Sequence, residues 1–175
     1  MAKQFGIHNA ELKARMPAAG ISLDLEKGYD AVIKQTDTYY PCIDGRKLKL
    51  RDNPAELILY RRIMDKDVPV MQSVGMKMPI KQPLELESIL TAALGSLCTV
   101  RKTRKVWLRG RTRIHVDEVE TLPGKFVEVE VVLGPGETYE EGVCEARCAM
   151  AGLGIAESDI INGSYSDMIM ANKKK

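Results

Sequence analysis

The chain has 175 residues, a length typical of a single domain. Hydrophobic residues make up 45% and charged residues 29%, which predicts a globular protein with a buried core. The 26 basic and 24 acidic residues leave a net charge of +2, too small for a protein that binds nucleic acid or membranes indiscriminately. No apolar run approaches the roughly 20 residues of a membrane helix, and residues 1–6 lack the apolar core of a secretory signal. We therefore expect one cytoplasmic domain over residues 1–170 and a basic tail over residues 171–175, with no nucleic-acid and no membrane partner.

The cysteines argue against a zinc site. Cys42, Cys98, Cys144 and Cys148 contain no CxxC motif, and only two histidines could add imidazole ligands. Cys144 and Cys148 lie one helical turn apart and could share a metal, but two reduced cysteines on a helix are the simpler interpretation. Free thiols are expected, as in a cytosolic protein.

Alternation of side chains with period two dominates the sequence and predicts many short β-strands. In chain order the predicted strands are 9–16, 46–51, 56–62, 71–78 (the weakest pattern), 99–108, 111–118 and 125–133. Two segments have helical periodicity: 84–94, which follows Pro83 and stops at Gly95, and 138–153, which begins with an acidic turn. A short helix over 22–29 is a further candidate. Because strands outnumber helices, the predicted fold class is α+β, built on a large antiparallel sheet or barrel.

Charged side chains recur at alternate positions of several predicted strands. On one strand such a face is usually the solvated one, but here the two signs cluster on different strands. Carboxylates gather at Glu11, Glu128 and Glu130, with Asp117 nearby in sequence. The cations gather at Lys13, Lys47, Lys49, Arg51, Arg62, Lys102, Arg104, Arg111 and Arg113. If the strands close into a barrel with these faces inward, the charges need a compensating ligand. A polyphosphate with divalent cations fits, since Arg and Lys hold phosphate oxygens and carboxylates hold Mg²⁺ or Mn²⁺.

An ordered set of segments carries a family resemblance. The segments are 9–15, 35–40 with 45–51, 57–62, 100–104, 112–119, 126–131 and 163–167. The first resembles the Glu-x-Glu-x-Lys strand that opens the CYTH superfamily, the triphosphate tunnel metalloenzymes. The others resemble that superfamily's later motifs in the same order, most closely those of its class IV adenylyl cyclase-like branch.

The resemblance implies an eight-stranded antiparallel β-barrel that forms a tunnel, with a few helices outside. It also implies a small-molecule triphosphate substrate and Mg²⁺ or Mn²⁺ as cofactor. Activities of the family are cyclisation of ATP to cyclic AMP with release of pyrophosphate, hydrolysis of thiamine triphosphate and hydrolysis of inorganic tripolyphosphate.

Site residues follow from the resemblance by position. The metal ligands would be Glu11, Glu128 and Glu130. The substrate-binding cations would be Lys49, Arg51, Arg62, Lys77, Lys102 and Arg104, with Lys77 in the loosest part of the match. Lys13, Arg113 and Asp117 would be catalytic, with Asp117 facing the tunnel near the reacting end. His115 is expected to be structural, because no nucleophile in the chain is flanked by a plausible base.

Two positions depart from the family pattern. Asn9 stands where the full motif has its first Glu. Because an amide oxygen binds Mg²⁺ more weakly than a carboxylate, the sequence leaves open whether the site holds one metal ion or two. Asn is also familiar at this position in the cyclase-like branch. Residues 63–67 lack the Pro-Asp step that usually follows the Tyr-x-Arg motif, which concerns the substrate-end pocket and not the triphosphate clamp.

The leading hypothesis is a metal-dependent enzyme that hydrolyses inorganic tripolyphosphate or an organic triphosphate. Hydrolysis is placed before cyclisation because no residues are identified that would recognise adenine or orient a ribose 3′-hydroxyl. Class IV adenylyl cyclase is the first alternative, and a non-catalytic binder of polyphosphate or nucleotide is the second. A structural barrel with salt-bridged walls is the remaining one. A homodimer through an apolar outer wall is also open.

Overall fold

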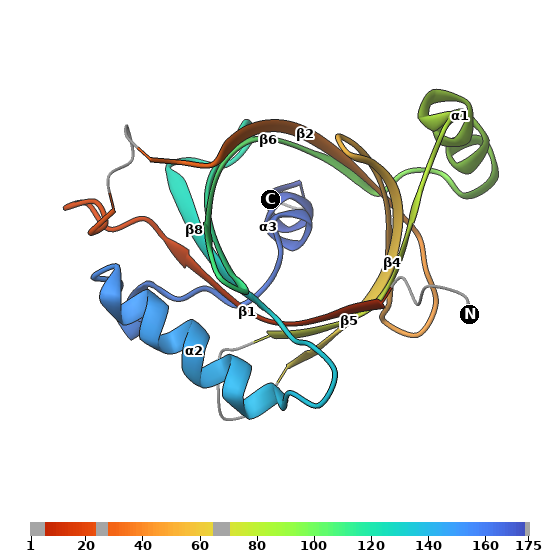
Figure 1. Cartoon of the computed structure of the whole chain (residues 1–175). Helices are drawn as coiled ribbons and strands as arrows, with labels where there is room; N and C mark the ends of the chain where they lie inside the picture. Colours follow the sequence, from red (N-terminus) through yellow and green to blue (C-terminus); the bar gives the residue numbers. More distant parts are fainter. Residues whose placement is uncertain (1–5, 24–27, 65–70, 174–175) are drawn as a thin grey trace.

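The computed structural model of the chain, which describes residues 6–23, 28–64 and 71–173, shows a closed antiparallel β-barrel (Figure 1). The strands are β1 (Gly6–Arg15), β2 (Ala31–Tyr40), β3 (Lys47–Asp52), β4 (Ala55–Met64), β5 (Met71–Pro79), β6 (Cys98–Arg109), β7 (Thr112–Val119) and β8 (Lys125–Val132). Around the barrel their order is β1-β5-β4-β3-β2-β6-β7-β8, and β8 pairs with β1 to close it. The α+β class and the eight-stranded barrel are therefore confirmed. All seven strands predicted from alternation are present, and β2 is the one that alternation did not single out.

Within residues 6–23, 28–64 and 71–173, three α-helices and one short 3₁₀ helix accompany the barrel: α1 (Pro83–Leu94), α2 (Tyr139–Gly152), η1 (Glu157–Asp159) and α3 (Tyr165–Asn172). The first two confirm the helices predicted over 84–94 and 138–153, and α3 was not predicted. A capping box between Ser164 and Asp167 starts α3. The helix runs through Asn172, two residues into the stretch expected to be a basic tail. The candidate helix over 22–29 falls mainly on residues 24–27, which lie outside the described residues.

The helix α2 covers the outer face of β1 and β8. The outward side chains of these two strands are small or aliphatic and fully buried, and Ala146 and Met150 of α2 pack against them. The outward set is Ala10, Leu12 and Ala14 on β1 with Val127, Val129 and Val131 on β8. This apolar core lies outside the barrel, so the alternate, charged residues of the same strands point into the lumen.

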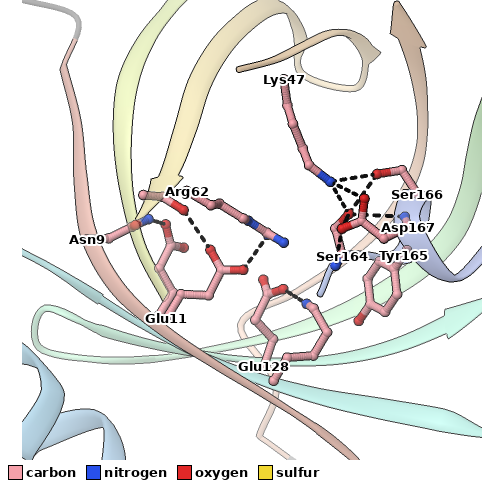
Figure 2. A network of polar contacts seen from close by, with 12 residues as sticks. Asn9, Glu11, Lys47, Arg62, Glu128, Ser164, Tyr165, Ser166 and Asp167 are labelled. Atoms are coloured by element: carbon pink, nitrogen blue, oxygen red, sulfur yellow. Dashed lines mark hydrogen bonds and ion pairs between the residues drawn. The ribbon is translucent and has the colours of Figure 1, made fainter. Parts of the chain in front are cut away.

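The helix α3 covers one end of the barrel, where it projects onto the lumen in the view along the barrel axis (Figure 1). The ring of Tyr165 packs edge-on against Phe126 with 5.1 Å between centroids. Lys47 donates to Ser164 and to Asp167, each at 2.6 Å, and fixes the start of the helix to β3 (Figure 2). In the part of the chain that the structure describes, α3 covers one end of the barrel and no helix covers the opposite end, which we call the open mouth.

The remaining surface includes several exposed apolar side chains. Helix α1 has no buried residue, and its Leu84 and Ile89 are exposed. The four cysteines are free thiols, of which only Cys98 is buried. No helix in the described part of the chain is long and apolar enough to cross a membrane.

Candidate functional site

The lumen of the barrel forms a cavity of about 550 Å³ to which all eight strands contribute side chains. Within the described part of the chain, eight Lys or Arg and five Asp or Glu side chains line it. Eleven of the twelve predicted site residues are among them: Glu11, Lys13, Lys49, Arg51, Arg62, Lys77, Lys102, Arg104, Arg113, Glu128 and Glu130. The closed sheet thus brings together residues that lie up to 119 positions apart in the chain, and it does so because alternation points them all to one side.

Asp117 is the exception, although it lies on the same inward face of β7 as Arg113 and His115 and directly opposite Arg104. Its side chain is fully buried and does not line the cavity. Arg104 donates to its two oxygens at 2.7 and 2.6 Å, and the hydroxyl of Tyr165 donates to it at 2.8 Å. The Lys102 ammonium lies 3.7 Å from the Asp117 carboxylate. Asp117 therefore lies inside the barrel beneath Arg104 and Tyr165 and holds Arg104 in place, because a buried guanidinium needs a fixed counter-charge.

Asp37 orients two further cations of the lumen and, unlike Asp117, lines the cavity itself. It accepts hydrogen bonds from Lys49 at 2.8 Å and from Arg51 at 2.7 and 2.9 Å. Burial alone would raise the pKa of Asp37, but the charges of Lys49 and Arg51 hold it well below its usual value. Two buried carboxylates, Asp37 and Asp117, thus orient four of the cations that line the lumen.

Two carboxylates on the neighbouring strands face each other in the lumen. Glu11 on β1 lies directly opposite Glu130 on β8. Glu11 accepts from Arg62 at 2.6 Å and from Ser73 at 3.3 Å (Figure 2). Glu130 accepts from the Asn9 amide and lies 3.5 Å from Arg113. The Asn9 Oδ1 atom is buried and has no hydrogen-bond partner among the described residues, so an oxygen ligand is left beside two carboxylates.

Glu128 has more partners than the other two predicted metal ligands. It accepts from Lys13, from Arg104 at 2.9 Å and pairs with His115 Nδ1 at 3.0 Å. Burial would raise the pKa of Glu128, but Lys13 and Arg104 hold it well below its usual value. Burial, and then Arg104, lowers the pKa of His115, which favours the neutral imidazole. In the described ranges no three Asp, Glu, His or Cys side chains are close enough to hold an ion as they stand. The oxygens of Asn9, Glu11 and Glu130 are the set that suits Mg²⁺ or Mn²⁺.

A comparison with sequence families decides what kind of domain this barrel is. The sequence model of the CYTH domain family matches residues 8–165, which span β1 to the start of α3. The chain belongs to the CYTH domain family. No curated protein matches its sequence.

Solved structures show that the fold of this CYTH domain is shared. A conserved hypothetical protein from Pyrococcus furiosus is 17% identical, with a TM-score of 0.74 over 91% of this chain and 98% of that one. The protein PH1012 from Pyrococcus horikoshii OT3 is 16% identical, with a TM-score of 0.75 over the same shares, 91% and 98%. A candidate adenylate cyclase from Vibrio parahaemolyticus is 14% identical, with a TM-score of 0.67 over 94% and 98% of the two chains.

The electrostatics of the CYTH domain's lumen favour an anionic ligand. Burial, and then the charge of Arg51, lowers the pKa of Lys49 to about 7, although Asp37 opposes the shift. Burial and Arg104 lower the pKa of Lys102 to about 8, with Asp117 opposing. These lysines are hard to protonate because their carboxylate partners do not outweigh burial and the neighbouring cations. An anion among them would restore their charge.

Sequence reasoning gave no role to four residues of this site: Asp37, Tyr39, Tyr60 and Tyr165. Tyr39 and Tyr60 line the cavity, and the Lys49 ammonium lies 5.6 and 5.7 Å from their ring centroids. Burial, and then Tyr60, raises the pKa of Tyr39 well above its usual value. A period-two pattern of Gln35, Asp37 and Tyr39 was present in the sequence and could have located the first two.

Proposed function

We propose that this CYTH domain is a metal-dependent enzyme that binds a triphosphate in the barrel lumen and hydrolyses it. The observation that carries the proposal is the excess of buried cations around the cavity, with Lys49 and Lys102 at lowered pKa values of about 7 and about 8. An unliganded wall of this kind is electrostatically unfavourable, and a polyanion of three or four charges would compensate it.

The basic residues divide by their place in the tunnel. Lys49, Arg51, Lys102 and Arg104 form the central clamp, each oriented by Asp37 or Asp117. Arg62 and Lys13 would neutralise charge close to the carboxylates, whereas Lys77 and Arg113 are more exposed, with 45% and 46% of the side chain accessible. Phosphoryl transfer depends mainly on in-line positioning and on neutralisation of the phosphate oxygens. A rigid, pre-oriented clamp supplies both.

Glu11, Glu130 and the free oxygen of Asn9 are the residues that would hold Mg²⁺ or Mn²⁺, and Glu128 would join them if it exchanged one of its present partners. A bound divalent cation supplies neutralisation of phosphate charge and a water of lowered pKa. In hydrolysis a water oxygen would form its bond to phosphorus as one phosphoanhydride bond breaks, the leaving phosphate would take the bonding electrons, and the proton of the water would pass to solvent. Lys13 would hold a phosphate oxygen close to these carboxylates. Asp117 would act through Arg104 and not on the substrate.

Cyclisation of ATP is the second candidate. The Vibrio parahaemolyticus structure is that of a candidate adenylate cyclase, but at 14% identity it supports the shared fold alone. Hydrolysis is placed first because the central clamp is complete whereas no group in the lumen is assigned to a ribose 3′-hydroxyl.

The deciding experiment is phosphorus NMR of the purified protein with ATP and, separately, with tripolyphosphate, each with Mg²⁺ and with Mn²⁺. Orthophosphate without cyclic AMP is the expected result. Cyclic AMP with pyrophosphate would make the protein a cyclase. Tight binding without any product, in the wild type with either metal, would leave it a non-catalytic triphosphate binder.

A further inference from the structure

The lumen changes character toward its open mouth. On four strands the inward side chains are charged or polar near the middle and become aliphatic at the end farthest from α3. The aliphatic residues are Ile7 on β1, Ile33 on β2, Val106 and Leu108 on β6 and Val132 on β8, and all of them line the cavity. We call these five residues the apolar half of the mouth.

The strand register places these residues at one end. Val132 pairs with Asn9, one step of the β1 alternation from Ile7, and Leu108 pairs with Arg113 on the same rim. The opposite ends of the same strands contact α3, since Lys13 lies 4.2 Å from the Tyr165 ring and Tyr39 packs in the cluster with Tyr165 and Ile169. The apolar half therefore lies away from α3, at the open mouth.

The other side of the mouth is polar. Glu56 on β4 and Lys77 on β5 line it and lie 3.0 Å apart, with Ile58 and Pro54 beside them. The mouth is thus aliphatic along the pair β2 and β6 and along the pair β8 and β1, with Arg113 of β7 between the two pairs, and it is charged on the side of β4 and β5. Inorganic tripolyphosphate has no surface that gains from aliphatic contact, whereas a heterocyclic ring presents both a hydrophobic face and polar edges.

From this arrangement we infer that the substrate is an organic triphosphate, and that Ile33, Val106 and Leu108 select it over inorganic tripolyphosphate by contact with its organic group. The inference rests on the proposed function, since it assumes that the phosphates occupy the central clamp. The cavity volume of about 550 Å³ agrees with it, because pockets that enclose ligands with an organic body measure about 300 to 1,000 Å³. Leu108 is 50% exposed, a position in which an aliphatic side chain is free to cover an entering ring.

The test compares ATP, thiamine triphosphate and tripolyphosphate as ligands and substrates of the full chain. The variant is the double substitution Ile33→Thr with Leu108→Thr, which keeps strand-forming side chains. The matched control is Val32→Thr, at the residue before Ile33 on β2, whose side chain is 47% exposed and does not line the cavity. Leu108→Thr alone serves if the double variant folds poorly, because half of Leu108 already contacts solvent.

The wild type is expected to prefer at least one organic triphosphate over tripolyphosphate, in dissociation constant and in kcat/KM. That preference should fall about tenfold in the double variant, the loss typical of one or two methylenes in an apolar pocket, and stay unchanged in the control. A wild type that prefers tripolyphosphate, or a preference that the double variant keeps, would overturn the inference. Absence of turnover with all three would overturn the proposed enzyme, while the ratio of dissociation constants would still decide the role of the mouth. Failure to bind any of them would overturn both.

Discussion

Glu11 and Glu130 lie directly opposite each other across the β1–β8 pair, with both carboxylates in the lumen. Like charges at opposed positions of a sheet destabilise it, and here Arg62 and Arg113 compensate from 2.6 and 3.5 Å. Such a pair is retained at a cost in folding free energy, which a divalent cation between the carboxylates would offset. An enzyme that binds a metal would need this opposed pair of carboxylates, whereas a barrel whose walls are only held together by salt bridges would not.

Glu130→Gln tests that distinction. We expect the variant to keep its melting temperature within a few degrees, because it loses one of two repelling charges, while metal-dependent turnover falls at least about 100-fold through loss of a ligand. Turnover per folded molecule and thermal melting are measured together. Glu118→Gln is the control, since Glu118 is exposed and pairs with Lys125 at 2.8 Å outside the lumen. A variant that melts much earlier but keeps its turnover would instead point to a structural barrel.

Asn9→Glu restores the acid with which the family motif normally begins. The Asn9 Oδ1 atom is buried and accepts no hydrogen bond from any residue that the structure describes, and a carboxylate there would add a third negative ligand beside Glu11 and Glu130. We expect the affinity for Mn²⁺ to rise about tenfold or more, measured by calorimetric titration. The protein without metal should become less stable, because three carboxylates then repel one another. Asn9→Gln, which keeps the amide, is the control, and equal Mn²⁺ affinities for the two variants would place the metal elsewhere.

Much of the barrel was predictable because period-two alternation reports directly which side chains face inward. The strand β5 had the weakest pattern, and the structure explains this through Gly75. Its backbone approaches β4 so closely that a Cβ atom would lie 2.2 Å from the Leu59 carbonyl oxygen. Glycine weakens a strand signal in the sequence, although here it is what allows the strand to pair.

The candidate site was predictable in membership but not in the roles of its members. Alternation could place Lys49, Arg51 and Arg104 on inward faces. It could not show that Asp117 lies behind Arg104, because period two gives the side of the sheet but not the depth of a side chain beneath longer neighbours. The partners of Glu128 were also beyond sequence reasoning, since they come from β1, β6 and β7, and only the register aligns them.

Asp117→Asn should move the pH dependence of triphosphate binding. The Asp117 carboxylate opposes the fall in the pKa of Lys102, which burial and Arg104 lower to about 8. Without that charge the pKa of Lys102 falls further, so the clamp loses its proton at lower pH. We expect the alkaline midpoint of binding to fall by about one pH unit, measured by titration between pH 6 and 9.5. Tyr165→Phe removes one hydrogen bond to Asp117 but keeps its charge, and should leave the midpoint in place. An unchanged midpoint in Asp117→Asn would mean that Lys102 does not bind the phosphate.

Lys49→Met should weaken triphosphate binding and raise the free energy of unfolding near pH 7. In the folded protein the pKa of Lys49 is about 7, against about 10.4 in an unfolded chain. Between these values the unfolded chain binds a proton that the folded protein does not, so the free energy of unfolding rises with pH. We expect the wild type to melt at higher temperature as pH rises from 7 to 9.5, and Lys49→Met to be more stable near pH 7 with a flatter dependence. Lys34→Met, on the exposed face of β2, should keep the wild-type dependence. Parallel pH profiles for wild type and Lys49→Met would show that Lys49 remains charged throughout.

Binding of ATP at pH 8 should draw protons from solution. At that pH Lys49 is mostly neutral and Lys102 about half neutral, according to pKa values of about 7 and about 8. A polyanion in the clamp raises the pKa values of both lysines, so they gain charge on binding. The terminal phosphate of ATP, with a pKa of about 6, has already lost its proton at pH 8. Calorimetry in buffers of different ionisation enthalpy should report uptake of about one proton per ATP, and less than half of that in Lys49→Met. Zero uptake in the wild type, with binding intact, would place the phosphates away from Lys49 and Lys102.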